Sequence, residues 1–417
     1  MQKQLYRIER SDMMGQTGQE TVIELTDTIE ETSEDEVIIQ FYRDSFSGKK
    51  KCDKQELTKE IKRIFESCNV NLLIGSGYCS EKLKTLSNLE SLIEENALTN
   101  IKNVSKKNAI EALILYVFFK NSIYPHKDDI KAFCSFESSN RFILKLADLL
   151  SNRNDKNLLK RVNIFTTNYD MYFELSLETN KIYYNDGFSG RLVPSFSTQN
   201  YNRIVKQIVQ NTERESELLT INLYKLHGSL TWSKKSDQDQ IVYISNPEEL
   251  LQSIEDQSIV FTDENFMYDK TSESNIKDTI KTINDSHTEF SDELLEGIDE
   301  FNKLYQKLHI INPTKKKFEE TLFSNVYYDL LRMYSNELEK NHSVLFVFGF
   351  SFKDEHIYSI TKRALSNPSM IMYIFVHDSN DIVCFKNMFK EHYNVFYIYY
   401  ENKKIDLNEF SNIMFGG

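Results

Sequence analysis

The sequence predicts an α/β fold, a doubly wound parallel sheet with helical insertions. Short apolar runs alternate with helical patterns along most of the 417 residues, as expected of repeated β-α-β units. Glycine or polar residues directly follow four of these apolar runs. In an open parallel sheet, ligands bind beyond the carboxyl ends of the strands, so the four segments are predicted to form one site.

The first of these segments is a glycine turn. A helical pattern from Lys54 leads into the apolar run Val70 to Ile74, which ends in Gly75-Ser76-Gly77. Glycine has no Cβ, so such a turn allows backbone amides to approach a phosphate closely. The third glycine of a dehydrogenase fingerprint is replaced by Ser80, which argues against hydride transfer. An ordinary strand-to-helix turn remains the alternative.

Two further buried strands end in polar segments. The run Val162 to Phe165 precedes Thr166-Thr167-Asn168-Tyr169-Asp170, and the run Ile221 to Leu226 precedes His227-Gly228-Ser229. The hydroxyls, amide and carboxylate of the first segment are suited to holding ribose hydroxyls and a water. Helix capping by Asn168 or Asp170 is the alternative there. A buried histidine with satisfied hydrogen bonds is the alternative for His227.

The C-terminal part predicts three more strands, Val344 to Phe348, Ile371 to Val376 and Val395 to Tyr400, the first of which runs into Gly349-Phe350-Ser351. Helices are expected between them.

Outside the predicted sheet, residues 1–55 are expected to form an N-terminal appendage, a candidate for oligomerisation, with strand patterns at Thr21 to Leu25 and Glu36 to Phe41. Helical insertions are expected near residues 80–160 and 235–320, and the second is rich in Asp, Glu, Ser and Asn.

Composition narrows the possible functions. Lys and Arg total 50 against 63 for Asp and Glu, and the net charge of −13 disfavours direct nucleic-acid binding. The five cysteines include no C-x-x-C pair, which is typical of a reduced, intracellular protein. We find no signal-peptide pattern and no apolar run of membrane-spanning length, so we expect a cytoplasmic protein without membrane contact.

Taken together, the four segments resemble the sirtuin family. Sirtuins carry a G-A-G-x-S turn, a T-x-N-x-D segment, a catalytic L-H-G and a late G-x-S segment, in this order at strand ends. The matching segments here are Gly75 to Cys79, Thr166 to Asp170, Leu226 to Ser229 and Gly349 to Ser351. The resemblance implies a Rossmann-like NAD-binding catalytic domain over residues 56–417.

The last segment is the most specific. It continues through Asp354 and His356, and with the upstream Asn312 to Lys315 and Tyr327-Tyr328 it is similar to a bacterial sirtuin-like branch found in antiphage defence proteins. We expect Asp354 and His356 themselves to be structural, as a helix N-cap and its first turn.

The resemblance also implies roles for individual residues. Asn168 would position the attacking water and the ribose, His227 would act as general base, and Asp170 would orient Asn168 or the nicotinamide amide. The implied NAD contacts are Gly75, Ser76 and Gly77 at the pyrophosphate, Thr166 and Thr167 at ribose hydroxyls, and Gly349 and Ser351 at the adenosine ribose.

Two departures from the family pattern matter. Cys79 stands where the family usually has serine, and nothing nearby in sequence would lower its pKa, so a thiol nucleophile is disfavoured. The four zinc cysteines of protein-deacylating sirtuins are missing, so we expect neither a zinc ribbon nor bound zinc.

These features favour hydrolysis of NAD to nicotinamide and ADP-ribose, with NAD as substrate. Depletion of NAD during antiphage defence, restrained by homo-oligomerisation or a partner, is the role that the resemblance implies. A HerA-type hexameric ATPase is the partner it suggests. The alternatives are an NAD-dependent protein deacylase or ADP-ribosyltransferase, and a non-enzymatic module that binds NAD or ADP-ribose.

Overall fold

The computed structural model describes residues 36–43, 46–83, 103–153, 158–209, 214–234, 240–262, 279–281, 283, 290–311 and 325–416. The chain divides after Asp35, and residues 36–417 form one compact unit. The strand predicted at Thr21 to Leu25 and the segment Asn312 to Lys315 lie outside the described residues.

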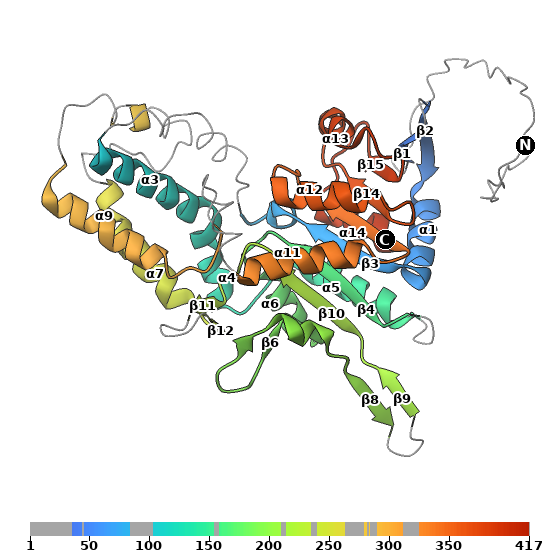
Figure 1. Cartoon of the computed structure of the whole chain (residues 1–417), viewed down its shortest axis with the longest axis horizontal. Helices are drawn as coiled ribbons and strands as arrows, with labels where there is room; N and C mark the ends of the chain where they lie inside the picture. The colour runs from blue at the N-terminus through green and yellow to red at the C-terminus, as the bar shows by residue number, and fades with distance from the viewer. Residues whose placement is uncertain are drawn as a thin grey trace, which may run out of the picture. The chain divides into compact units, whose positions relative to one another are not determined.

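A nine-stranded sheet forms the centre of this unit (Figure 1). Its strands are β1 (Glu36–Arg43), β2 (Phe46–Asp53), β3 (Asn69–Ile74), β4 (Arg161–Thr166), β5 (Tyr184–Asn185), β10 (Thr220–Lys225), β13 (Ser343–Phe348), β14 (Ile371–Phe375) and β15 (Val395–Tyr399). They follow the order β2-β1-β15-β14-β13-β3-β4-β10-β5. In this sheet only the pairs β2–β1 and β1–β15 are antiparallel, so the predicted α/β fold with a parallel-dominated sheet is confirmed.

The sheet is wound in two directions from its middle. From β3 the chain moves outward through β4 to β10, and it then returns to place β13 against the other side of β3. From β13 it moves outward the opposite way through β14 to β15. The switch point therefore lies between β3 and β13, where ligands bind in folds of this kind.

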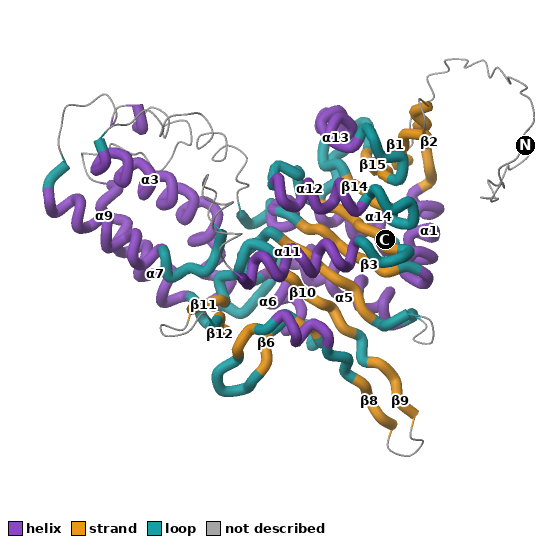
Figure 2. The backbone as a smooth tube through the Cα atoms, in the orientation of Figure 1, coloured by secondary structure: helices purple, strands orange, loops and turns teal. Residues whose placement is uncertain are grey.

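Helices cover both faces of the sheet (Figures 1 and 2). One face carries α1 (Lys54–Ser67), α5 (Glu137–Ser151), α6 (Tyr172–Thr179) and α14 (Leu407–Phe415), and the other carries α11 (Asn325–Leu338), α12 (Glu355–Ala364) and α13 (Ile382–Phe389). The strand period of two divides each strand between the faces. In β13, Val344 and Phe346 join the first core, while Leu345 and Val347 join the second.

A ladder of buried amides crosses the central strands. Asn222 donates to Asn163 at 2.8 Å, Asn163 donates to Asn71 at 2.8 Å, and Asn71 donates to the Ser343 hydroxyl at 2.9 Å. Asn163 also donates to Glu337 of α11 at 3.1 Å. A buried amide is costly unless it is hydrogen-bonded, so the ladder favours the one register in which these side chains face one another.

Segments from both predicted insertions pack together. Helix α3 (Val104–Phe118) contacts α9 (Asp292–Tyr305), which in turn contacts α7 (Glu248–Gln257) (Figure 1). Their core is aromatic, with the ring of Phe261 4.9 Å from the rings of both Tyr116 and Phe301. The sequence could not show that two insertions so far apart along the chain share a core.

Two predicted boundaries need correction. Residues 1–55 were expected to be an appendage, but β1 and β2 extend the sheet through pairing of β1 with β15. Helix α5 lies within the expected insertion at 80–160, yet it packs against α1, α6 and α14 over the sheet. Both differences arise from pairing and packing between distant segments, which local patterns do not encode.

The remaining elements are short. They are α4 (Lys127–Lys131), a π-helix (Phe119–Ile123), 3-10 helices (Ser76–Cys79, Tyr124–His126, Thr198–Asn202, Ser258–Thr262, Ser379–Asp381) and the strands β6 (Phe188–Ser189), β7 (Ser195–Phe196), β8 (Lys206–Val209), β9 (Arg214–Glu217), β11 (Trp232–Lys234) and β12 (Ile241–Tyr243). Within the described ranges, we find no helix with the length and apolar character needed to cross a membrane.

Candidate functional site

The four predicted segments meet at the carboxyl edge of the sheet. The Asn168 side chain donates to the Gly75 carbonyl at 3.1 Å, which joins the ends of β4 and β3. The Leu226 amide donates to the Thr166 carbonyl at 2.8 Å, and the Gly75 amide donates to the Phe348 carbonyl at 3.0 Å. These bonds bring the ends of β10 and β13 into the same cluster.

Glycines allow the two central turns to touch. A Cβ on Gly75 would lie 2.4 Å from the Gly349 carbonyl oxygen, and one on Gly77 would lie 2.6 Å from the Gly349 Cα. Gly349 also has a φ of +65°, a conformation that favours glycine. The Gly77 amide donates to the Gly349 carbonyl at 3.1 Å. The glycines therefore serve the contact between turns, and in this conformation the amides of Gly75 and Gly77 are already paired.

Polar side chains remain at these turns for a phosphate or a ribose. Ser76 and Ser351 are both exposed; Ser76 lies between Gly75 and Gly77, and Ser351 lies two residues after Gly349. Thr167 is half-buried, and its amide donates to the Ile74 carbonyl at 3.3 Å. Thr166 instead builds the turn, because its buried hydroxyl accepts the Asn168 amide at 3.0 Å.

The orientation of the Asn168 side-chain amide follows from its partners. Its Nδ2 lies 3.1 Å from the Gly75 carbonyl oxygen and 3.3 Å from the Cys79 Sγ. A carbonyl oxygen only accepts, so the atom facing Gly75 must be the nitrogen. Within the described part of the chain Oδ1 finds no hydrogen-bond partner. Asn168 is therefore held by its donors and keeps one acceptor for a ligand.

Asp170 is buried and fully engaged. One oxygen accepts the Tyr172 amide at 3.0 Å, two residues further on, but Asp170 is not the N-cap of α6, because that position is occupied by Met171. The other accepts the Cys79 thiol at 3.1 Å. Since Cys79 also accepts from Asn168, Asp170 orients Asn168 through the thiol.

The surroundings of Cys79 favour its neutral thiol over the thiolate. Burial, and then the negative charge of Asp170, raise the pKa of the Cys79 thiol well above its ordinary value. A nucleophilic cysteine requires the opposite shift. The raised pKa of the thiol agrees with the expectation that Cys79 is not a nucleophile.

A buried ion pair that the sequence analysis missed lies behind this turn. Lys225, the last residue of β10, is 2% exposed, and its ammonium lies 3.1 Å from Glu174 of α6. The same ammonium donates to the Asp170 carbonyl. Burial raises the pKa of Glu174, while the Lys225 charge opposes that shift. A lysine within the apolar run Ile221 to Leu226 was the signal available in the sequence.

His227 faces a carboxylate from a distant segment. Its Nε2 lies 3.0 Å from Oδ2 of Asp354. The other oxygen of Asp354 accepts the amides of His356 and Ile357 at 3.1 Å each, so the predicted N-cap of α12 is confirmed. The contact with His227 was not predicted, because it joins residues 127 positions apart.

The backbone around His227 is held by contacts with residues 309–311. The Ile311 amide donates to the His227 carbonyl at 2.8 Å. Gly228 forms an isolated antiparallel β-bridge with Ile310. Gly228 has a φ of +83°, and a Cβ there would lie 2.1 Å from the His309 carbonyl oxygen. Only glycine fits this position, which explains the His-Gly pair physically.

One family model matches a segment that contains part of this site. Residues 162–294 match the family model of the SIR2-like domain. The match includes the segments of Asn168 and His227, and it supports a sirtuin-like family and an NAD-related activity. No curated protein matches the chain.

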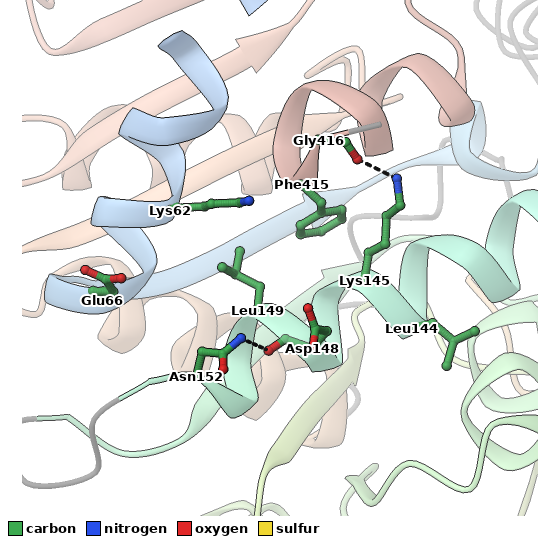
Figure 3. A pocket seen from close by; sticks show the side chains of 9 residues that line it. All are labelled: Lys62, Glu66, Leu144, Lys145, Asp148, Leu149, Asn152, Phe415 and Gly416. Atoms are coloured by element: carbon green, nitrogen blue, oxygen red, sulfur yellow. Dashed lines mark hydrogen bonds between the residues drawn. The ribbon is translucent and has the colours of Figure 1, made fainter. Parts of the chain in front are cut away.

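Among the residues that the structure describes, no group of three or more His, Cys, Asp or Glu side chains could hold a metal ion. A hollow of about 520 Å³ is lined by Lys62, Glu66, Leu144, Lys145, Asp148, Leu149, Asn152, Phe415 and Gly416 (Figure 3). Lys62 and Glu66 belong to the end of α1, just before β3 begins, so this hollow lies toward the opposite edge of the sheet.

Proposed function

We propose that this protein hydrolyses NAD to nicotinamide and ADP-ribose at the carboxyl edge of the sheet. The observation that carries this proposal is the Asn168 side chain, which two donor bonds hold so that Oδ1 remains as an acceptor. An acceptor at this position suits a water or a ribose hydroxyl, both of which can donate to it. The SIR2-like match over the same segment supports NAD as the ligand.

The chemistry asks little of the protein. Nicotinamide leaves as a neutral molecule from a cationic ring, so it needs no general acid, and positive charge develops at the ribose carbon. Water adds to that carbon and loses one proton, giving ADP-ribose, nicotinamide and H⁺. We assign orientation of the water to Asn168 and acceptance of the proton to His227.

Asp354 would determine which ring nitrogen of His227 accepts the proton. A carboxylate only accepts, so the Nε2 that faces Asp354 carries the proton of the neutral ring. Nδ1 is then the basic nitrogen. When the ring becomes an imidazolium, the Asp354 charge stabilises it, as in other histidine-carboxylate pairs.

The proposed biological role is depletion of NAD during antiphage defence. A toxic hydrolase needs restraint, and we propose that the active form is a homo-oligomer larger than a dimer, regulated by a HerA-type hexameric ATPase. Light scattering, paired with NAD hydrolysis assays with and without that ATPase, tests this. A strictly monomeric protein with full constitutive turnover would contradict it.

The central test replaces each assigned side chain. We expect Asn168→Ala and His227→Ala each to lower NAD cleavage by about 10² to 10⁴-fold, the usual effect of removing a general base or its equivalent. The products are separated by chromatography, so nicotinamide plus ADP-ribose is distinguished from deacylated or ADP-ribosylated protein. The control is His392→Ala, which lies just before β15 at the other edge of the sheet. Full activity in both site variants, with a lower melting temperature, would make these residues structural.

A further inference from the structure

Cys79 lies between the side chains of Asp170 and Asn168. It is 2% exposed and ends the short 3-10 helix that follows the glycine turn. Its Sγ is 3.1 Å from Oδ2 of Asp170 and 3.3 Å from Nδ2 of Asn168. No other described side chain contacts both residues by a hydrogen bond.

The direction of each bond follows from the atoms involved. An ionised carboxylate has no proton to give, so the thiol must donate to Asp170. The Asn168 Nδ2 has two protons; one goes to the Gly75 carbonyl and the other points to the sulfur. The thiol therefore donates and accepts at once. A thiol is a weak partner in general, but a charged acceptor strengthens its donor bond.

We propose that Cys79 is a positioning residue that relays the Asp170 carboxylate to the Asn168 amide and so fixes the direction of Oδ1. This role rests on the NAD hydrolysis proposed above. Gly75 alone fixes one N–H of the amide and leaves rotation about that bond open. The second bond, to sulfur, defines the amide plane. Cys79 makes no covalent bond to the substrate and touches none of the reacting atoms.

Replacement by serine and by alanine separates the bonds from the packing. Cys79→Ala removes both the donor and the acceptor, whereas Cys79→Ser keeps both on a shorter C–O bond. We expect kcat for NAD to fall about 10- to 100-fold in Cys79→Ala, with KM within about twofold of wild type. Cys79→Ser should recover most of kcat. The matched control is Cys52→Ala, another buried cysteine, in β2, which should leave kcat unchanged.

A second measurement tests the hydrogen bond between Cys79 and Asn168 without NAD turnover. We expect the unfolding equilibria of wild type, Cys79→Ala, Asn168→Ala and the double variant to be non-additive by about 3- to 30-fold, because the two side chains share a bond. Denaturant unfolding measures this at a temperature where all four proteins are folded. The same curves show that the kinetic assays use folded protein.

The outcomes distinguish the two proposals. A wild-type protein that never cleaves NAD contradicts the proposed function, and the unfolding cycle still decides whether the relay exists. An active wild type with unchanged kcat in Cys79→Ala overturns the relay alone. Equal losses in Cys79→Ser and Cys79→Ala also overturn it, because then the volume of sulfur, and not hydrogen bonding, would matter.

Discussion

Two histidines of this protein have opposite environments. His227 faces the Asp354 carboxylate through Nε2 at 3.0 Å. His126 is fully buried, and its Nε2 accepts the Met171 amide at 2.9 Å. A carboxylate accepts and an amide donates, so the neutral rings carry their protons on different nitrogens, Nε2 in His227 and Nδ1 in His126.

The partners also separate the two histidines by charge. Burial lowers the pKa of His126 to about 4, although Asp170 and Asp129 oppose the shift, so this ring stays neutral at physiological pH. His227 instead faces the Asp354 carboxylate. The difference teaches that burial and the hydrogen-bond partner, rather than the residue type, determine the tautomer of each ring and keep His126 neutral.

Asp354→Asn should have the largest effect. The asparagine can keep its oxygen on the α12 amides while it presents an N–H to His227, which moves the ring proton to Nδ1 and gives His227 the tautomer of His126. We expect NAD cleavage to fall on the order of 10² to 10⁴-fold with little change in melting temperature. Steady-state kinetics with thermal melting measure both.

The control for that change is Glu355→Gln, an exposed neighbour in the same first turn of α12. It removes the same charge without touching His227 and should keep full activity. An Asp354→Asn protein as active as Glu355→Gln would show that the tautomer of His227 does not matter.

The next effect concerns the buried ion pair of Lys225 and Glu174, in contrast to the single neutral ring of His126. Lys225→Met leaves Glu174 buried without its cation, and we expect the free energy of unfolding to fall by about 3–5 kcal/mol. Because burial raises the pKa of Glu174, protonation should relieve part of this loss as the pH falls toward 4.5.

Urea unfolding of Lys225→Met, Glu174→Leu and the double variant measures this ion pair. The double variant should recover most of the stability, because no unpaired charge remains. If the two single losses simply add, the pair is not coupled.

The third effect titrates His126 itself. Its pKa is depressed in the folded state, so the unfolded chain takes up the proton first, and this stability is present above pH 6.5 and lost as the pH falls toward 4. His126→Gln keeps an acceptor for the Met171 amide but cannot titrate. Between pH 7 and pH 5 we expect it to gain roughly 2 kcal/mol in unfolding free energy relative to wild type. A constant difference across that range would contradict the buried, neutral assignment.

The smallest effect is expected from chelation. Both histidines are assigned to protein partners, and the cysteine spacing predicts no zinc site. Treatment with EDTA should therefore change NAD cleavage by less than about twofold, and metal analysis should find less than one zinc per chain. One tightly held zinc would require a ligand set that involves other residues.

Local patterns located the strands well. The runs predicted at Val70 to Ile74 and Val344 to Phe348 are β3 and β13, each within one residue. The glycine turns and the cap at Asp354 were also readable, because they depend on residues close in sequence. The role of the glycines was less readable: Gly75 and Gly349 touch each other, and no pattern within either turn shows that contact.

What the sequence determined by itself was the order of strands and the polar residues that end them, since periodicity and turn chemistry are local. What only the tertiary structure decided was which of those residues are partners. Asp354 reaches His227, Cys79 reaches Asp170, and Lys225 reaches Glu174. The physical reason is that hydrogen bonds and ion pairs act over a few ångströms, and the winding of the sheet from β3 outward determines which strand ends come within that range.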